Sequence, residues 1–144
     1  GYLYDFHLWL WKERGYIYSS NWRDTDRPFL HQINGETVPI VELPKDSIHD
    51  DTAYDMYTIQ SPMHTNLRSG REFIQIWEEE LDGILEEKGF MNFVMHPQYI
   101  GRPGYLRNLR EFVRYAKDHG AWIATDEQVA RYLLVQNGFP EYKR

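Results

Sequence analysis

Hydrophobic positions recur with helical spacing most clearly between Ser69 and Lys88. Ser69 followed three residues later by Glu72 has the form of a capping box, and Gly89 is a typical residue to end a helix. The apolar residues that form the stripe are Phe73, Ile76, Trp77, Leu81, Ile84 and Leu85. This spacing predicts an amphipathic helix with one buried face.

Three further segments have the pattern of helices. A short one follows Asp5, a candidate N-cap, and ends at Gly15. A second covers Tyr105 to Asp118 and presents one apolar face. A third covers Asp126 to Val135, with Thr125 or Asp126 as its N-cap.

Short apolar runs between the helices are typical of strands. We expect strands at Tyr16 to Tyr18, at Thr37 to Leu43, at Phe90 to Met95 and at Ala121 to Ala124, the last one buried. Pro39 lies within the second run and lacks an N–H donor, which predicts an edge strand or a strand end.

The long stretch 45–66 shows no clear period. It fits a functional loop, with His64 as a candidate ligand contact, or a covering loop packed by its own Tyr and Met side chains.

Helices that alternate with short apolar strands predict an α/β fold with parallel strands. No glycine-rich phosphate-binding loop follows any predicted strand. An open, doubly wound domain usually carries such a loop early in the chain. A piece of a (β/α) barrel therefore fits the order of elements better.

Composition limits the classes of function. The chain has 144 residues, which is enough for one domain with a substantial core. Its net charge of -6 gives little support for binding to nucleic acid or to an anionic membrane. The absence of cysteine excludes disulfides and thiolate metal sites but not sites of His and Asp. No membrane span or signal peptide is visible, so the compartment stays open, with the cytoplasm slightly favoured.

His96 is the first candidate for chemistry, because it ends a predicted strand and precedes Pro97. A histidine has a pKa near 7 and suits general acid–base catalysis at such a position. The alternative is a strand-end histidine that only bonds to the backbone. From these residues alone, the second interpretation is favoured.

Three longer segments carry a resemblance to a known family. They are YIYSSNWRDTDRPF (16–29), VELPKDSIHDDTAY (41–54) and FVMHPQYIGRPGYLRNLREFVRYAKDHGAWIATDEQVARY (93–132). The last one combines a hydrophobic-x-His-Pro motif, a Gly-Arg-Pro turn, a helix and a Trp-bearing segment. In this order they resemble the polysaccharide deacetylase superfamily (NodB-homology, carbohydrate esterase 4-like), and the nearest branch is that of the allantoinase-related amidohydrolases.

The resemblance implies a distorted (β/α) barrel that hydrolyses a non-peptide amide, usually an N-acetyl group, and a bacterial origin. It implies a divalent metal, with zinc as the first choice, that is bound by an Asp and two His. These ligands belong to an N-terminal half that these 144 residues do not match. The alternative is a branch of the family that works without a metal. A complete barrel needs about 200 residues or more. Residues 1–144 are therefore expected to be the C-terminal portion of one catalytic domain.

The resemblance also suggests roles for individual residues. It makes His96 the general acid and favours this over the strand-end interpretation, and it places Val94 in the pocket for the acyl methyl group. Trp22, Asp24, Asp26 and Arg27 lie in a loop that borders the family's substrate site, where an Asp can orient the catalytic His. Their spacing departs from the DxxDW form of the sugar deacetylases, and a surface Asp–Arg pair is the alternative.

Two further candidate sites each have two interpretations. Arg102 could bind a carboxylate or a ureide oxygen through two hydrogen bonds, or it could hold its loop to a helix end. Asp50 and Asp51 follow His49, but adjacent residues rarely face one ion, and solvated loop carboxylates are more common. We therefore expect no metal ligand within this chain.

Two hypotheses follow. In the first, the chain supplies the general acid and part of the pocket of an amidohydrolase acting on a small amide or an N-acetylated sugar. It is then inactive and poorly folded alone, and it needs a companion N-terminal polypeptide. In the second, the chain is a non-catalytic pseudo-enzyme or a carbohydrate-binding module, stable as a monomer or as a homo-oligomer. Neither hypothesis involves a membrane or nucleic acid.

Overall fold

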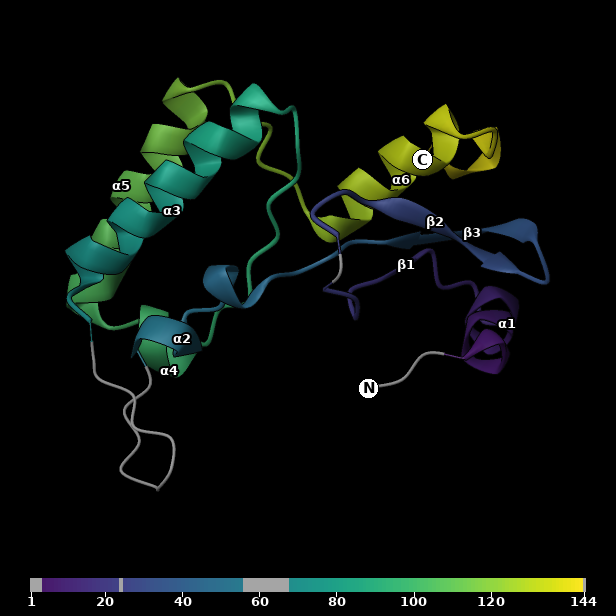
Figure 1. Ribbon diagram of the computed structural model, residues 1–144, viewed down its shortest axis with the longest axis horizontal. Helices are drawn as coiled ribbons and strands as arrows, with labels where there is room; N and C mark the ends of the chain where they lie inside the picture. The colour runs from purple at the N-terminus through teal and green to yellow at the C-terminus, as the bar shows by residue number, and fades with distance from the viewer. Residues whose placement is uncertain (1–3, 24, 56–67, 144) are drawn as a thin grey trace. The chain divides into compact units, whose positions relative to one another are not determined.

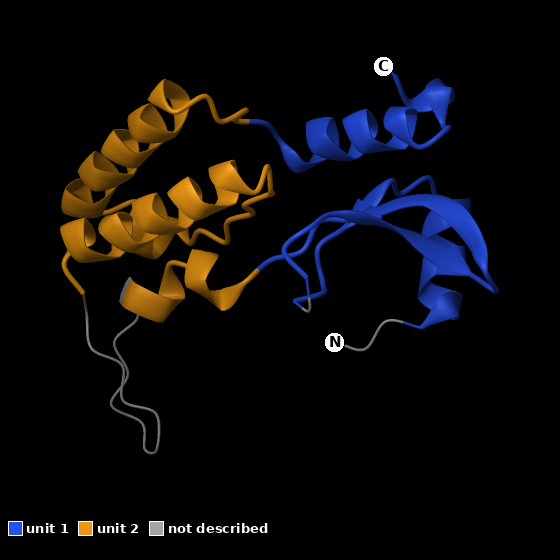
Figure 2. Cartoon of the chain, turned by 45° about the horizontal axis from the view of Figure 1, so that its top comes forward, with its two compact units in different colours: residues 1–45, 124–144 blue, residues 46–123 orange. Residues whose placement is uncertain are grey.

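The computed structural model describes residues 4–23, 25–55 and 68–143 of the chain. The chain divides into two compact units, which Figure 2 shows in separate colours. Unit 1 comprises residues 1–45 and 124–144, and unit 2 comprises residues 46–123. Unit 1 contains the sheet, whereas unit 2 contains the two longest helices (Figure 1).

Unit 1 is built on a three-stranded mixed sheet. Its strands are β1 (Tyr18–Ser19), β2 (Phe29–Ile33) and β3 (Glu36–Glu42), in the order β1-β3-β2. β1 runs parallel to β3, and β2 runs antiparallel to it. The predicted α/β class is confirmed, but the expected parallel arrangement holds only for β1 and β3, and the sheet of the described residues is small and does not close.

Two helices of unit 1 pack against this sheet. α1 (Asp5–Glu13) buries Leu8 against Val38 and Ile40 of β3. Figure 1 shows α6 (Asp126–Gln136) on the other side of the sheet, followed by a 3-10 turn, η2 (Pro140–Tyr142). The predicted capping of α6 by Thr125 is confirmed, because its hydroxyl accepts from the Gln128 amide, 3.3 Å away. Tyr4, rather than Asp5, is the N-cap of α1.

The β2–β3 hairpin is absent from the sequence predictions. Asn34 and Gly35 join the strands with φ angles of 52° and 82°. Two consecutive positive φ angles are the hallmark of a two-residue hairpin turn, and Asn-Gly is its strongest sequence signal. This dipeptide would therefore have located β2.

The prediction that Pro39 marks an edge strand or a strand end is wrong, because β3 is the central strand. Pro39 is tolerated there for two reasons. β1 pairs only with Val41 and Glu42, and the β2–β3 register is interrupted between Leu30 and Gln32. The missing N–H of proline therefore falls at an irregularity of the ladder.

Unit 2 is organised by α3 (Gly70–Glu86) and α5 (Pro103–Asp118), which pack along each other. Shorter elements complete it: η1 (Ser47–His49), α2 (Thr52–Asp55) and α4 (Pro97–Ile100). The capping box of α3 is confirmed, since the Ser69 amide donates to Glu72 at 2.8 Å and the Glu72 amide donates back to the Ser69 hydroxyl at 3.2 Å.

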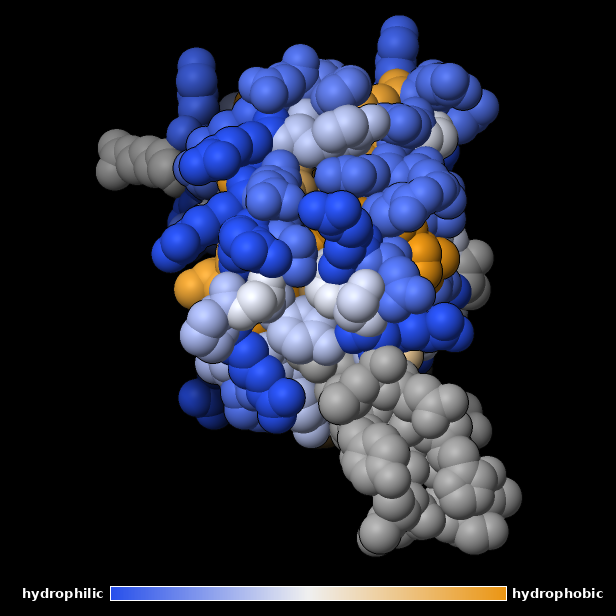
Figure 3. Space-filling model, turned by 90° about the vertical axis from the view of Figure 1, so that its left-hand side faces the viewer, coloured by the Kyte–Doolittle hydropathy of each residue, from blue (hydrophilic) through white to orange (hydrophobic). Residues whose placement is uncertain are grey.

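The core of unit 2 is aromatic. The Trp77 ring lies 5.1 Å from Phe73, 4.7 Å from Phe93 and 5.6 Å from Phe112, centroid to centroid. These separations are in the range in which aromatic rings attract one another beyond their area burial. The surface on the α3–α5 side is correspondingly hydrophilic, with scattered apolar residues (Figure 3).

Two of the predicted strands are wrong. Of Phe90 to Met95, only Val94 is paired, in a single parallel bridge with Asp50. Residues 121–124 belong to no strand of the described structure, and Trp122 and Ile123 are 61% and 50% exposed. A strand needs a neighbouring strand, so a correct apolar pattern is not sufficient to form one. None of the helices in the described residues is long and apolar enough to cross a membrane.

The aromatic core gives a direct stability prediction. Replacing the fully buried Phe73 with Ala should lower the free energy of unfolding by about 3–5 kcal/mol, because it removes apolar area and leaves a cavity. Arg71→Ala, at an exposed position of the same helix, should change it by less than about 0.5 kcal/mol. Urea denaturation of both variants tests this, and equal effects would contradict the assigned core.

Candidate functional site

His96 lies where an extended segment turns into a short helix. It is the N-cap of α4, with φ and ψ of -110° and 116°, and Pro97 occupies the first helical position. A residue before proline favours extended backbone, and proline is well suited to start a helix. The His-Pro pair therefore fixes the point at which the chain turns, and the His96 side chain remains 34% exposed.

A narrow backbone bridge brings a second segment beside His96. The Val94 amide donates to the His49 carbonyl at 3.0 Å, and the Asp51 amide donates to the Val94 carbonyl at 3.1 Å. This is the hydrogen-bond pattern of parallel strands. Because the two segments run in the same direction, Asp51 lies next to His96.

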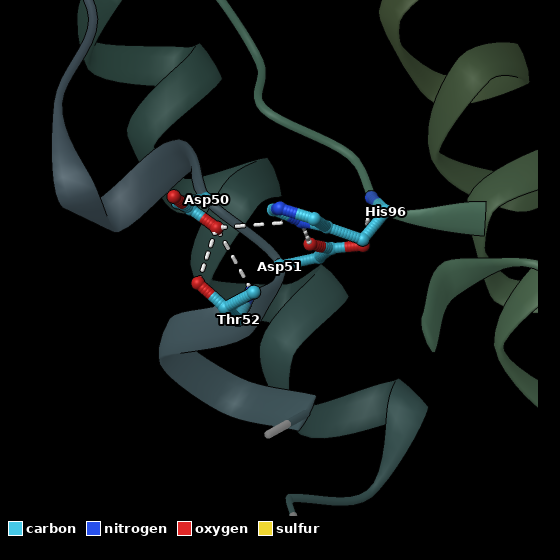
Figure 4. A network of polar contacts seen from close by, with 4 residues as sticks. All are labelled: Asp50, Asp51, Thr52 and His96. Atoms are coloured by element: carbon cyan, nitrogen blue, oxygen red, sulfur yellow. Dashed lines mark hydrogen bonds and ion pairs between the residues drawn. The ribbon is translucent and has the colours of Figure 1, made fainter. Parts of the chain in front are cut away.

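Asp51 binds His96 through both carboxylate oxygens. Its Oδ1 lies 2.6 Å from Nδ1 of the His96 ring, and its Oδ2 accepts from the His96 amide at 2.8 Å (Figure 4). The Asp51 side chain is fully buried. An ionised carboxylate can only accept, so this contact assigns the proton to Nδ1 and leaves Nε2 for other chemistry.

Asp50 has a different role from its neighbour. Its Oδ1 accepts from the Thr52 amide at 3.0 Å and from the Thr52 hydroxyl at 2.6 Å, which caps the start of α2. The same oxygen lies 3.9 Å from His96 Nδ1 (Figure 4). Asp50 therefore adds negative charge near the imidazole without forming its main hydrogen bond.

The segment that carries Asp51 is anchored to the aromatic core. The Ile48 carbonyl accepts from Trp77 Nε1 at 2.8 Å and from the Tyr54 hydroxyl at 2.9 Å. Burial raises the pKa of Tyr54, and the carboxylates of Glu80 and Asp46 act in the same direction. Tyr54 thus remains a neutral donor that holds η1 in place.

His49 is buried within the same segment, with its ring 5.7 Å from that of Phe93. Its Nε2 has no hydrogen-bond partner among the described residues. Burial lowers the pKa of His49 and outweighs the opposing effect of Glu80 and Asp46. His49 is therefore held neutral beside the bridge that positions Asp51.

Asp50, Asp51 and His96 could also be considered as a metal site, because each offers one ligand atom within 4.8 Å of the others. In this structure His96 Nδ1 and Asp51 Oδ1 are hydrogen-bonded to each other, and Asp50 Oδ1 accepts from Thr52. A metal-binding imidazole nitrogen must be unprotonated, so an ion would have to replace the Asp51 contact at Nδ1 or bind at Nε2. The observed contacts are those of a hydrogen-bonded Asp51–His96 pair with the Asp50 carboxylate beside it.

The structure places the other predicted site residues as follows. Val94 is half-buried and forms the bridge to Asp50, two residues before His96. Arg102 is the exposed N-cap of α5 in the same unit. Trp22 belongs to unit 1, and its ring packs edge-on against Phe29 at 6.3 Å.

Asp26 and Arg27 are exposed on the loop before β2, also in unit 1. Asp24 and His64 lie outside the described residues. His96, Val94 and Arg102 therefore belong to unit 2, whereas Trp22, Asp26 and Arg27 belong to unit 1.

Asp51 is the residue whose role the sequence analysis missed. It was interpreted as a solvated loop carboxylate, which is wrong because its side chain has no exposure. The Asp-Asp pair followed by an aromatic residue was part of the recognised pattern. Nothing in that pattern distinguishes the aspartate that faces inward from the one that caps a helix.

Comparisons with known proteins give a consistent result. No family model matches the chain, and no curated protein matches it. Solved structures do match, among them a protein assigned as a polysaccharide deacetylase from Mycobacterium smegmatis, with a TM-score of 0.76 and 27% identity over 89% of this chain.

Two further matches each cover 94% of this chain with a TM-score of 0.73. One is Puue allantoinase, at 20% identity, and the other is a protein assigned as a polysaccharide deacetylase from Pseudomonas aeruginosa PAO1, at 22% identity. The chain spans 44% of the length of all three structures. It thus has the fold of a portion of the polysaccharide deacetylases and allantoinase, as the sequence motifs predicted.

The Asp51–His96 contact predicts the tautomer of the imidazole. In wild-type protein the ¹⁵N spectrum of His96 should show a protonated Nδ1. In Asp51→Asn the population should shift towards protonated Nε2, because the amide offers one acceptor oxygen and can turn its NH2 towards the ring. Asp50→Asn serves as the matched control and should leave the tautomer unchanged. An unaltered spectrum in Asp51→Asn would contradict the assignment.

The buried His49 predicts a pH dependence of stability. The unfolded chain takes up a proton on this residue near pH 6.5, whereas the folded chain, with its lowered pKa, does not. The free energy of unfolding should therefore fall as the pH drops below about 6.5, by at most about 1.4 kcal/mol per pH unit from this residue. Denaturation at pH 7.5 and 5.5 should show a smaller decrease for His49→Leu than for wild type; identical slopes would be inconsistent with a neutral, buried His49.

Proposed function

We propose that this chain is the C-terminal portion of a deacetylase-like hydrolase that cleaves a non-peptide carbon–nitrogen bond, with His96 as the general acid. The observation that carries the proposal is the Asp51–His96 pair, in which a fully buried carboxylate orients a partly exposed imidazole. The fold shared with a portion of the deacetylases and allantoinase supports the same class of enzyme.

The chemistry of an amide explains why such a histidine is needed. When the tetrahedral intermediate collapses, the carbon–nitrogen bond breaks and the nitrogen leaves poorly as an anion. His96 in its imidazolium form gives its Nε2 proton to that nitrogen, so that a neutral amine departs. Asp51 holds the ring through Nδ1 and stabilises the imidazolium, which is the role of the aspartate in a catalytic triad.

The remaining predicted residues would bind the substrate. Val94 would contact the acyl methyl group, and Arg102 would bind a carboxylate or a ureide oxygen. The loop residues Trp22, Asp24, Asp26 and Arg27 would contact the rest of a small amide or an N-acetylated sugar. A divalent metal, with zinc as the first choice, would polarise the amide carbonyl. As the resemblance implies, its ligands and the general base are assigned to residues outside this chain.

The coverage of the matched structures supports this division. The chain spans 44% of their length, so more than half of each matched structure lies outside the matched region. We therefore propose that the active enzyme contains this chain together with an N-terminal polypeptide of the same domain.

A non-catalytic carbohydrate-binding role is the second candidate, and exposed aromatic residues on α1 favour it. Phe6 is 65% exposed and Trp9 is 51% exposed, and their rings stack with centroids 6.5 Å apart. Exposed aromatic side chains form good binding surfaces. This role predicts glycan binding without turnover.

Activity of the assembled protein tests the first proposal. The tagged chain, recovered from its native host with any associated polypeptide, should hydrolyse small acetamides or N-acetylated sugars, with and without added Zn²⁺. His96→Gln should lower kcat by about 10²–10⁴-fold, the usual contribution of a general acid. His119→Gln, at an exposed histidine that ends α5, is the control and should retain activity. A His96→Gln protein as active as the control would refute the general-acid role.

A further inference from the structure

The first helix of unit 1, α1, has an apolar side that its own sheet does not cover. The inner side packs on the sheet through the buried Leu8. On the outer side, Phe6 and Trp9 are each more than half exposed, although their rings stack on each other. Single exposed aromatic residues are common, but two stacked rings on one face of a nine-residue helix form a contiguous apolar patch. Such a patch is typical of a surface that is buried in an assembly.

A hollow lies beside the C-terminal end of the same helix. The Gly15 amide donates to the Lys12 carbonyl at 3.1 Å, and the Tyr16 amide donates to the Trp11 carbonyl at 3.0 Å. With Gly15 at a φ of 74°, these two bonds form a Schellman motif, which ends the helix and brings Tyr16 back beside Trp11. The resulting hollow has a volume of about 510 Å³ and is lined by Leu10, Trp11, Arg14 and Tyr16. It is large enough to admit an aromatic side chain.

Opposite charges lie at the two ends of one edge of α1. Asp5 in the first turn and Lys12 in the last turn are both exposed. Seven residues make about two turns of a helix, so the two side chains lie on the same edge. Neither forms an ion pair with another side chain of the described residues. Glu13 is turned by about 100° from Lys12 and lies on the side of the exposed rings.

A second copy of the chain, docked with its α1 antiparallel, is complementary to all of these features. A two-fold axis perpendicular to α1 places the start of each helix against the end of the other, so each contact between different residues occurs twice. Asp5 of one copy then lies at the same edge as Lys12 of the other. On the opposite edge, Phe6 reaches the hollow at the end of the other copy's helix. A partner of another sequence would not require an acid and a base at matched positions of one edge.

The apolar area is sufficient for the centre of a dimer interface. Aromatic side chains bury roughly 150–250 Å² each, so Phe6, Trp9 and Tyr16, all more than half exposed, offer about 300–400 Å² together. A standard interface buries about 800 Å² per partner and has an apolar centre within a polar rim. The three rings would form the centre, and the charged side chains of α1 would form the rim. Aromatic residues in such a centre usually dominate the binding energy.

We propose that the outer side of α1 is a homodimer interface, in which two copies of this chain pair antiparallel through Phe6, Trp9 and the hollow at the helix end. Asp5 and Lys12 form two symmetric ion pairs at its rim and set the register of the helices. The interface lies within unit 1 and is independent of the proposed hydrolase. It assigns the exposed rings of α1 to a protein contact instead of a glycan.

The first experiment measures the copy number and the strength of self-association. Native mass spectrometry of the full chain in its native assembly should show two copies per particle. In sedimentation equilibrium, Trp9→Ala should raise the Kd of self-association at least about tenfold, because it removes a central ring. Tyr132→Ala, at a similarly exposed ring of α6, is the matched control and should change the Kd less than about twofold. A single copy per wild-type particle at about 100 μM, with or without a companion polypeptide, would overturn the proposal.

The second experiment exchanges charges to test the register and the identity of the partner. Asp5→Lys and Lys12→Asp should each dimerise about tenfold more weakly than wild type at low ionic strength, because like charges then meet twice. An equimolar mixture of the two variants should regain the wild-type affinity within about threefold, since every lysine then faces an aspartate. Misfolding of α1 could not be rescued by mixing. A mixture that associates no more tightly than the single variants would overturn the antiparallel pairing.

Discussion

The described structure of unit 2 depends on a carboxylate with no access to water. Asp51 is fully buried, and a buried carboxylate is stable only when its oxygens find donors. Both donors come from His96, through its amide and its ring. This requirement fixes the distance between two segments that are 45 residues apart, and the aromatic core maintains it, because Trp77 of α3 binds the Ile48 carbonyl just before Asp51. Substitutions in the aromatic core are therefore expected to alter the position of the His96 imidazole.

Unit 1 also contains a buried carboxylate, but different donors satisfy it. Glu42 is also buried at the end of an extended segment, but its donors are a hydroxyl, an imidazole and two loop amides. Asp51 orients a side chain that can exchange protons, whereas Glu42 orients backbone. In both units a buried carboxylate at the end of a strand-like segment holds a neighbouring segment in place. In unit 2 it binds the amide and ring of His96, and in unit 1 it binds the amides of Asn21 and Trp22.

The helices were predictable because their determinants are local. The Ser69–Glu72 capping box, the apolar stripe of α3 and the Thr125 cap lie within a few residues of the structure that they specify. The strands at Phe90–Met95 and Ala121–Ala124 were not, because a strand also depends on a partner that its own sequence does not reveal. For the site, the motif indicated His96 but not Asp51, since burial of a carboxylate results from tertiary packing. The Asn34–Gly35 turn also has a local sequence signal, but it was not among the sequence predictions.

The proposal that His96 delivers a proton to the leaving nitrogen is tested most directly by the choice of leaving group. The assembled protein and its His96→Gln variant would be compared on an N-alkyl acetamide and on an activated aryl acetate, whose phenolate departs without protonation. The account predicts a loss in kcat of about 100-fold or more on the amide and less than about threefold on the ester. Equal losses on both substrates would contradict it, because they would mean that His96 acts in a step other than departure of the leaving group.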